Sequence, residues 1–373
     1  MSRRQLLRAQ SPPRCAYTRT RLGRLSFWFI GGDNTQRFAR QIAVFAGDHA
    51  MTIARRQFLQ LAGAGLLAGA PRAFATEDYP TRPVRWIIGF PPGGGADQVA
   101  RLMAPSLSER LGQQVVIENR PGAGTFVSVQ AVLNSAPDGY TLLHYGGSTL
   151  MNAKISANPP PLEEGIAPVA GLVAYPMILV AHPLFPAKTV PELIDYAKSN
   201  PGKVTMASFG IGTASHLAGE LLKQMAGIDM VHVPYRGGAP MITDLLAGQV
   251  QIGFDVMVTS LPHVRTGALR ALAVAGSRRF EALPEVPTIA EALPGYEART
   301  WAGVGAPKGT PAAVIARLDR EIGAVLAEPT IEARLADLGT VPMPLNAQEF
   351  AAFIAAESEK WGKVVRIANI APQ

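Results

Sequence analysis

From Val84 onward, short apolar runs alternate with longer segments whose apolar residues recur every three or four positions. Runs of about five apolar residues are typical of buried strands, and the longer period is typical of helices that bury one face. The alternation predicts βαβ units and a mainly parallel sheet. The first units comprise strands at 84–89, 114–118 and 140–144 and helices at 97–111 and 126–134.

The same pattern restarts after Tyr175. Two successive α/β modules without a long linker predict two lobes around a cleft, with the chain crossing near Tyr175 and near Ala275. We expect a first lobe of residues 76–175 plus 276–373 and a second lobe of residues 176–275. The later strands are expected at 177–181, 204–208, 230–233, 252–255, 269–275 and 299–304, and the later helices at 190–199, 216–226, 239–247, 261–265, 311–327, 330–338 and 347–367.

Residues 51–75 have the features of a secretory signal peptide. The pair Arg55-Arg56 precedes an apolar stretch rich in Gly, Ala and Leu, and residues 73–75 offer small side chains at a cleavage point. The paired arginines indicate the twin-arginine type, which a receptor reads as an address. A membrane anchor needs about 20 apolar residues, and this stretch is shorter. We expect a soluble periplasmic protein, cleaved after Ala75.

Residues 1–50 lie upstream of this signal and show no convincing periodicity. They contain nine Arg, two Asp and the only cysteine of the chain, Cys15. A signal peptide begins near its own Met, and Met51 is available. We therefore expect residues 1–50 to be a mis-annotated upstream segment; the alternative is a disordered basic arm that binds nucleic acid or lipid.

Removing residues 1–75 changes the charge of the chain. The 35 Lys and Arg and 28 Asp and Glu of the whole sequence include 12 basic and 2 acidic side chains in residues 1–75, so the remaining 298 residues carry 23 and 26, a net charge of −3. The basic excess therefore gives no support for nucleic-acid binding. The absence of cysteine from the mature chain excludes disulfides, thiolate metal sites and a lipid-anchored cysteine. We expect a monomer with no cofactor and no metal.

Five glycine-rich loops follow predicted strands. Ligands of open parallel sheets bind beyond the carboxyl ends of the strands, where glycine allows close backbone approach. The helix N-termini that follow offer free N–H groups and a positive potential, which suit carboxylate or phosphate. One such loop is commonly structural, but loops from both halves indicate that several line one cavity. The loops are residues 91–95, 121–124, 146–149, 209–213 and 235–238.

These loops lie within a longer series of motifs that spans the mature chain. The motifs are GFPPGGGADQVAR at 89–101, ENRPGAG at 118–124, PDGYTLL at 137–143, FGIGTASHLAGE at 209–220, VPYRGGAP at 233–240 and GFD at 253–255. In type and order they resemble the extracytoplasmic binding proteins of tripartite tricarboxylate transporters, the Bug family. The resemblance implies a type II periplasmic-binding-protein fold that closes around a small carboxylate for membrane transporter subunits.

The resemblance also implies a set of ligand-binding residues. In the family, first-lobe loops hold one carboxylate largely through backbone amides and water, and second-lobe residues meet a further carboxylate or hydroxyl. The first-lobe candidates are Phe90, Pro92, Gly93, Gly94, Gly124 and Thr125, with Ser148 and Thr149 from the third loop. The second-lobe candidates are Ser208, Gly212, Thr213 and His216, with Asp255 facing the distal part of the ligand.

Two departures from the family pattern fall where the ligand tail should lie. After Gly124 the family usually has another glycine and then Ile-Gly, whereas residues 125–128 read TFVS. The usual Asn-Pro after the Ser/Thr pair of the third loop is replaced by LMNAK at 150–154. Substrate identity therefore does not carry over, and the bulk of Phe126 favours a narrower pocket or an apolar ligand.

Several polar residues near these loops also have ordinary structural interpretations. Asp97 opens a helix, where a carboxylate commonly satisfies free N–H groups. His216 has two interpretations, a donor to the ligand or a local hydrogen-bonding group. Arg236 either pairs with a carboxylate or lies at a solvated edge. Asp255 ends an apolar strand and therefore needs a polar partner.

Two other functions compete with a transport receptor. An exported dinucleotide-dependent enzyme would share the outline of glycine loop, helix and a second strand ending in Glu118, but the G-x-G-x-x-G spacing, a G-x-S-x-G motif and a metal-ligand cluster are absent from the sequence. The other alternative is a receptor that reports its ligand to a membrane signalling partner. The sequence does not separate transport from signalling.

Overall fold

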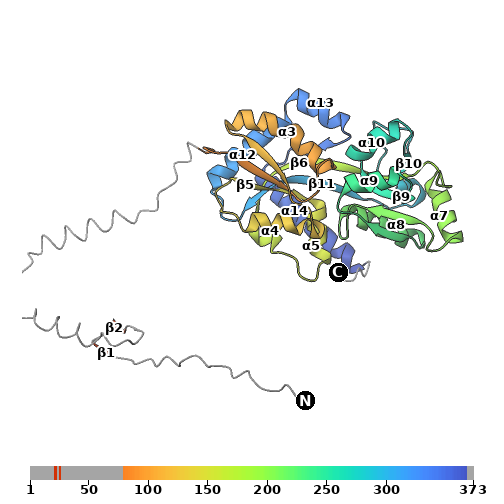
Figure 1. Cartoon of the computed structure of the whole chain (residues 1–373), viewed down its shortest axis with the longest axis horizontal. Helices are drawn as coiled ribbons and strands as arrows, with labels where there is room; N and C mark the ends of the chain where they lie inside the picture. The colour runs from red at the N-terminus through yellow and green to blue at the C-terminus, as the bar shows by residue number, and fades with distance from the viewer. Residues whose placement is uncertain (1–20, 23–24, 27–78, 368–373) are drawn as a thin grey trace, which may run out of the picture. The chain divides into compact units, whose positions relative to one another are not determined.

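The computed structural model describes residues 21–22, 25–26 and 79–367 (Figure 1). The expected signal peptide and its cleavage point lie outside these residues. The chain divides into two units, residues 1–73 and 74–373. In the first unit, the described residues form the antiparallel pair β1 (Arg21–Leu22) and β2 (Leu25–Ser26). All other described elements belong to the second unit.

The first half of the second unit is built on a sheet with strand order β4-β3-β5-β11-β6. β3, β4 and β5 run parallel because helices connect them, whereas β11, β6 and β12 pair antiparallel. The strands are β3 (Val84–Ile88), β4 (Val115–Asn119), β5 (Thr141–Gly146), β11 (Arg299–Pro307) and β12 (Val341–Pro342). The helices are α3 (Gly95–Leu111), η2 (Ala123–Thr125), α4 (Phe126–Leu133), α5 (Gly147–Ile155), α6 (Leu162–Gly165), α12 (Ala312–Leu326), α13 (Pro329–Asp337) and α14 (Ala347–Ile367).

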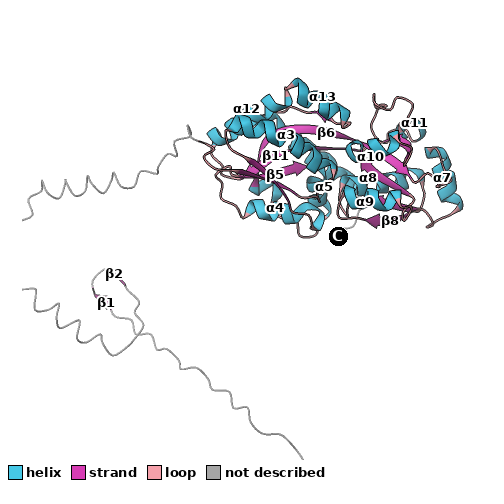
Figure 2. Cartoon of the chain, turned by 45° about the horizontal axis from the view of Figure 1, so that its top comes forward, coloured by secondary structure: helices cyan, strands magenta, loops and turns pink. Residues whose placement is uncertain are grey.

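The second half has the strand order β6-β9-β7-β8, with β10 also paired to β6. β7, β8 and β9 are parallel, and β6 and β10 are antiparallel to their neighbours. Figure 2 shows strands in the interior of this unit with helices around them. The strands are β7 (Thr205–Ser208), β8 (Val231–Pro234), β9 (Ile252–Val256) and β10 (Arg270–Val274). The helices are α7 (Val190–Ser199), α8 (Ala214–Ala226), α9 (Gly238–Leu246), α10 (Met257–Arg265) and α11 (Ile289–Ala292).

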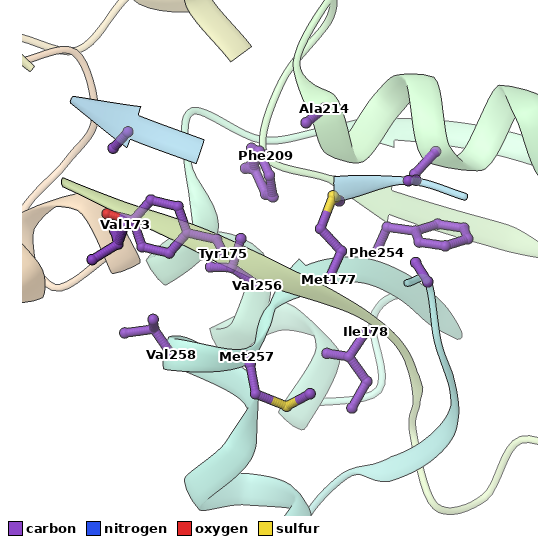
Figure 3. Close-up of a cluster of buried hydrophobic side chains, with 14 of the residues drawn as sticks. Val173, Tyr175, Met177, Ile178, Phe209, Ala214, Phe254, Val256, Met257 and Val258 are labelled. Carbon is purple, nitrogen blue, oxygen red and sulfur yellow. The ribbon is translucent and has the colours of Figure 1, made fainter. Parts of the chain in front are cut away.

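One long strand, β6 (Ile166–Ala181), belongs to both sheets. Its residues up to Pro176 pair with β11 in the first sheet, and its residues from Met177 pair with β9 and β10 in the second. Figure 3 shows apolar side chains of the second half, including Phe254 and Met257, packed around this strand. The expected two-lobed α/β fold is confirmed, but the sheets are mixed rather than mainly parallel.

The chain returns to the first sheet later in the sequence than the crossing that we expected near Ala275. Between β10 and β11 the chain stays with the second sheet: α11 packs on α7, and the Tyr296 hydroxyl donates to the Ala218 carbonyl at 2.8 Å. The Ala298 N–H still bonds the Ala275 carbonyl before β11 begins at Arg299. This irregular segment has no hydrophobic period, so its sequence did not indicate which sheet it joins.

The elements near the site that were not predicted include α5 and the first part of β6. α5 begins directly at the glycine pair Gly146-Gly147, which the sequence indicated only as a loop. The first part of β6 was missed because Pro168 and Gly171 interrupt its apolar run. Within the described ranges, no helix combines the length and the apolar character needed to cross a bilayer.

Candidate functional site

A cavity of about 60 Å³ lies between the two sheets, and we call it the inner cavity. Its walls combine residues of the first half, such as Gly94 and Thr149, with residues of the second half, such as Gly238 and Asp255. Tyr175 of the shared strand β6 and Trp301 of β11 complete it. The cavity therefore depends on segments that are far apart in the sequence.

Four helices begin at this cavity: α3, α5, α9 and α10. They are 17, 9, 9 and 9 residues long, and none of these four described N-termini carries a side-chain cap. The first N–H groups of a helix have no partner inside the helix, and their dipoles give that end a partial positive charge. Among the described residues that line the cavity, none is Lys or Arg. Within the described lining, the positive partial charge available to an anion therefore comes from backbone N–H groups.

Asp255 is the carboxylate in the wall of the inner cavity, and its side chain is fully buried. Its Oδ2 accepts hydrogen bonds from the hydroxyls of Thr259 and of Ser260, the latter at 2.6 Å. Its Oδ1 has no hydrogen-bond partner among the described residues. Burial raises the pKa of Asp255 to about 6, although hydrogen bonds from both hydroxyls and from the backbone of Val256 oppose that shift.

Two further buried polar atoms of this wall lack a partner among the described residues, His144 Nδ1 and the Tyr175 hydroxyl. Both side chains belong to residues that are 5% exposed. Burial lowers the pKa of His144 to about 4, so the imidazole is neutral at pH 7. Buried polar groups are normally hydrogen-bonded. Three such atoms around one cavity are therefore a strong indication of a ligand site.

Phe90 and Phe209 separate the inner cavity from a larger one. Phe90 follows β3 and Phe209 follows β7, and their rings meet edge to face with centroids 6.1 Å apart. Both residues line both cavities. Figure 3 shows Phe209 in the same buried cluster as Tyr175 and Met177 of the shared strand.

The larger cavity, here called the outer cavity, has a volume of about 450 Å³. Its wall includes η2, where Ala123 and Thr125 have positive φ angles of 46° and 86°. Such backbone conformations are costly for residues other than glycine and gather at functional sites. Asn152 supports them by donating to the carbonyls of Ala123 and Gly124 at 3.2 and 3.1 Å. The exposed Arg236 is the basic residue of the described wall.

The first glycine loop is held in shape by Asp97. Its carboxylate accepts from the Gly93 N–H at 2.9 Å, from Arg101 at 2.9 Å and from Asn119 at 3.0 Å. Burial alone would raise the pKa of Asp97, but these hydrogen bonds hold it below its ordinary value. The structural interpretation of Asp97 fits this geometry.

The two halves touch around the cavities. The Ala214 N–H at the start of α8 donates to Ser148 Oγ at 3.2 Å. A Cβ added to Gly237 would lie 2.6 Å from Cδ of Pro91, so the loops before α3 and α9 approach each other closely. The glycine at this position is required by both the contact and its φ of 144°.

The structure brings together some of the residues expected to bind ligand and leaves others outside. Five line the inner cavity, namely Phe90, Gly94, Ser148, Thr149 and Asp255. Gly124 and Thr125, again with Phe90, line the outer cavity. Six line neither cavity, namely Pro92, Gly93, Ser208, Gly212, Thr213 and His216.

The polar residues of this last group have partners inside the second half. The Thr213 hydroxyl donates to the Gly210 carbonyl at 2.6 Å, and Ser208 Oγ lies 2.6 Å from His232 Nε2. His216 Nδ1 accepts from the Gly212 N–H at 3.2 Å, and its ring stacks on His232 at 4.1 Å. Burial lowers the pKa of both histidines to about 4. These contacts hold the loop of residues 209–213 in shape.

Other lining residues were not expected from the sequence. His144, Tyr175 and Trp301 come from strands, whereas the sequence motifs that predict a ligand site lie in the loops after strands. A histidine within the apolar run of β5 was the available signal for His144, whereas nothing in the sequence marked Trp301. In the described residues, no group of three or more His, Cys, Asp or Glu is placed to hold a metal ion. The arrangement is suited to binding an anion without a side-chain cation.

The chain has clear relatives. A family model described as the tripartite tricarboxylate transporter family receptor matches residues 99–370. Protein BugT of Bordetella pertussis is 37% identical over 303 residues, which cover 80% of this chain and 93% of BugT. The structure of the periplasmic binding protein BugD matches with a TM-score of 0.76 at 34% identity, covering 79% of this chain and 100% of BugD. A structure of an R. palustris protein with adipate matches with a TM-score of 0.77 at 34% identity, covering the same shares of the two chains.

Proposed function

Because the chain belongs to the tripartite tricarboxylate transporter receptor family, we propose that it captures a small carboxylate in the periplasm and presents it to membrane transporter subunits. The family is one of solute-binding receptors, and this is the role of the chain rather than catalysis. A homologue of similar fold is known with adipate, which supports a carboxylate of similar size as the ligand here.

The observation that supports the ligand class best is the convergence of four uncapped helix N-termini on the inner cavity. Helix N-termini are ready-made sites for carboxylates and phosphates. Donors that are fixed before binding cost little to arrange around an anion. The ligand carboxylate therefore lies in the inner cavity, bound by first-turn N–H groups of α3 and α5 directly or through water.

The proposed ligand contacts follow from this position. Gly94 supplies the close backbone approach, Ser148 and Thr149 lie in the first turn of α5, and Asp255 meets a different part of the ligand. Gly124 and Thr125 line the path of the ligand tail. The remaining expected residues shape the loops, with Pro92 and Gly93 before α3 and Ser208, Gly212, Thr213 and His216 before and within α8.

We propose that the two lobes close on the ligand by bending within β6 and just before β11. These are the two places where the pairing of the chain passes from one sheet to the other. We also propose export through the Arg55-Arg56 signal with cleavage after Ala75. Replacing both arginines by Lys should leave the precursor in the cytoplasm, and unchanged export would leave only a general secretory signal.

A thermal-shift screen of mature protein against dicarboxylates, tricarboxylates, hydroxy acids, aromatic acids and amino acids tests the proposal. An acid at 100 times its Kd stabilises a protein by about 2.7 kcal/mol, which is readily seen in a melt. The matched control for each hit is its uncharged amide, which cannot present a carboxylate to the helix N-termini. An amide that stabilises as well as its acid, or a screen in which no acid acts, would contradict the proposal.

A further inference from the structure

The inner cavity offers two opposite kinds of hydrogen-bonding group. The free N–H groups of four helices are donors that need a hydrogen-bond acceptor. Asp255 Oδ1 calls for a donor, because a carboxylate oxygen only accepts. A simple carboxylate satisfies the helices and leaves Asp255 without a partner.

Asp255 lines the cavity, and its Oδ1 has no hydrogen-bond partner among the described residues. The other oxygen, Oδ2, is fixed by Thr259 and Ser260 of α10. A Cβ at position 238 would lie 3.4 Å from Oδ1, so Gly238 leaves space beside this oxygen that a side chain would occupy. A fully buried carboxylate oxygen without a partner is costly, and a ligand donor removes that cost.

The size of the inner cavity limits how far apart the two ligand groups can be. A water needs roughly 10–15 Å³ of cavity measured in the same way, so about 60 Å³ holds roughly four to six atoms of similar size. A carboxylate, the carbon that carries it and one substituent on that carbon fill this space. The donor is therefore on the carbon next to the carboxylate.

We propose that the inner cavity is a subsite for the head group of a 2-hydroxy or 2-amino carboxylate, with Asp255 accepting the hydrogen bond of the 2-substituent. This inference rests on the proposed receptor function and specifies its substrate class. His144 Nδ1 and the Tyr175 hydroxyl are the remaining unpartnered atoms of the described wall, and both can complete the binding of the hydroxyl or ammonium group.

A second ionised carboxylate does not fit in this cavity beside the first. Asp255 already contributes a negative charge at neutral pH, His144 is neutral, and the described lining has no Lys or Arg to balance a further anion. Like charges at short range in a buried site repel strongly. Any second carboxylate of the ligand lies beyond Phe90 and Phe209, in the outer cavity that Arg236 lines.

Two six-carbon series test the proposal by calorimetry at pH 7.5. The first comprises hexanoate, 2-hydroxyhexanoate, 2-aminohexanoate and 2-oxohexanoate, and the second comprises adipate with the same three substituents. For wild type, we expect the 2-hydroxy or the 2-amino acid to bind about tenfold to a hundredfold more tightly than the unsubstituted acid, as for a hydrogen bond to a charged group. The 2-oxo acid offers an acceptor to Asp255 and should bind no better than the unsubstituted acid.

Asp255→Asn provides the reciprocal test because it keeps the shape of the side chain. Its amide oxygen can take the hydroxyl donors of Thr259 and Ser260, which turns the amide NH₂ toward the ligand. The variant should therefore prefer the 2-oxo acid over the 2-amino acid, reversing the wild-type order. Asp337→Asn, the same change of charge on an exposed residue of α13, should keep the wild-type order.

Each outcome decides the proposal. A wild-type preference for 2-hydroxy or 2-amino acids that reverses in Asp255→Asn supports it. Equal binding of unsubstituted and substituted acids, or an unchanged order in Asp255→Asn, overturns it while leaving a carboxylate receptor intact. If neither series binds wild type, the proposal also fails, and the broader carboxylate screen then shows whether the receptor function fails with it. Because the wild-type comparison needs no variant, poor folding of Asp255→Asn does not remove the test.

Discussion

The inner and outer cavities meet at one pair of aromatic rings but are built in opposite ways. The inner cavity, about 60 Å³, is surrounded by helix N-termini and buried polar atoms that lack a partner in the described chain. The outer cavity, about 450 Å³, is bordered by the turn at η2 and the exposed Arg236. Phe90 and Phe209 divide them.

This difference separates two properties of a receptor. Fixed backbone donors and one buried carboxylate set strict requirements for a small head group in the inner cavity. A wide outer space bordered by a solvated side chain tolerates tails of different length and charge. The comparison therefore predicts large effects from changes in the inner cavity and small effects from changes at the outer one.

The largest expected effect comes from filling the inner cavity. Gly94 has an ordinary φ of −75°, and a Cβ there would contact only the Pro91 carbonyl, at 3.7 Å. Gly94→Val should therefore fold normally, yet its methyl groups displace the ligand carboxylate. We expect a loss of affinity of at least roughly a hundredfold, the effect of losing about 3 kcal/mol of hydrogen bonding to a charged group.

Calorimetry of the tightest acid from the screen measures this loss. Gly323→Val on α12 is the matched control. Its added Cβ would meet nothing within 4 Å, and the residue lines neither cavity. Binding of wild-type strength by Gly94→Val would show that the carboxylate is held elsewhere.

The second effect is on stability and concerns the cost of burying Asp255. The pKa of Asp255 is about 6 in the folded protein against an ordinary value of 3.8. As pH rises from about 4 to 6, the unfolded chain releases this proton while the folded protein keeps it, so the wild type loses stability relative to a variant without the group. Asp255→Asn should match wild type at pH 4 and exceed it by roughly 3 kcal/mol at pH 8.

Urea unfolding of both ligand-free proteins between pH 4 and 8 gives the difference directly. His144, His216 and His232 have lowered pKa values and act in the opposite direction, costing stability as pH falls from 6.5 toward 4. They are present in both proteins, so their contribution cancels in the comparison. If the free energies of unfolding of the two proteins changed in parallel with pH, folding would not raise the pKa of Asp255.

A smaller effect distinguishes the loop before α8 from the inner cavity. The Thr213 hydroxyl donates to the Gly210 carbonyl, and that carbonyl also accepts from the Thr213 N–H at 3.3 Å. Thr213→Val should lower the free energy of unfolding by about 1 kcal/mol and change ligand affinity less than about twofold. A loss of affinity beyond tenfold without a loss of stability would instead place this hydroxyl on the ligand.

The smallest effect is expected at Arg236. It is exposed at the outer cavity, and an ion pair in that setting contributes about 0–1 kcal/mol. Arg236→Ala should weaken binding of adipate-type acids less than about fivefold and should not affect their monocarboxylic analogues. Titrations of both acids at low and high salt check this, since screening removes what remains of the effect. Abolished binding in this variant would reverse the roles of the two cavities.

The sequence predicted the parallel strands and their loops well, because apolar runs followed by glycine turns have local signals. It also identified Gly94, Ser148, Thr149 and Asp255, which line the inner cavity. It did not identify Tyr175 or Trp301, because these residues reach the cavity through antiparallel pairing of β6 and β11, and nothing local reports such pairing.

The hydroxyls of the second lobe show the opposite error of sequence reasoning. Ser208 and Thr213 follow a strand and border glycines, which is the pattern of a ligand loop. In the structure Ser208 pairs with His232, and Thr213 donates to a carbonyl of its own loop. Sequence reveals that a polar group is available, but only the fold shows whether a neighbour already satisfies it.

A crystal structure of the complex with the tightest-binding acid tests the central claim most directly. The account predicts carboxylate oxygens at hydrogen-bond distance, roughly 2.7–3.2 Å, from the first-turn N–H groups of α3 and α5 or from waters bound to them. It also predicts a 2-hydroxyl or ammonium group on Asp255 Oδ1. A carboxylate paired with the Arg236 guanidinium in the outer cavity, with the inner cavity filled by an apolar tail, would contradict it.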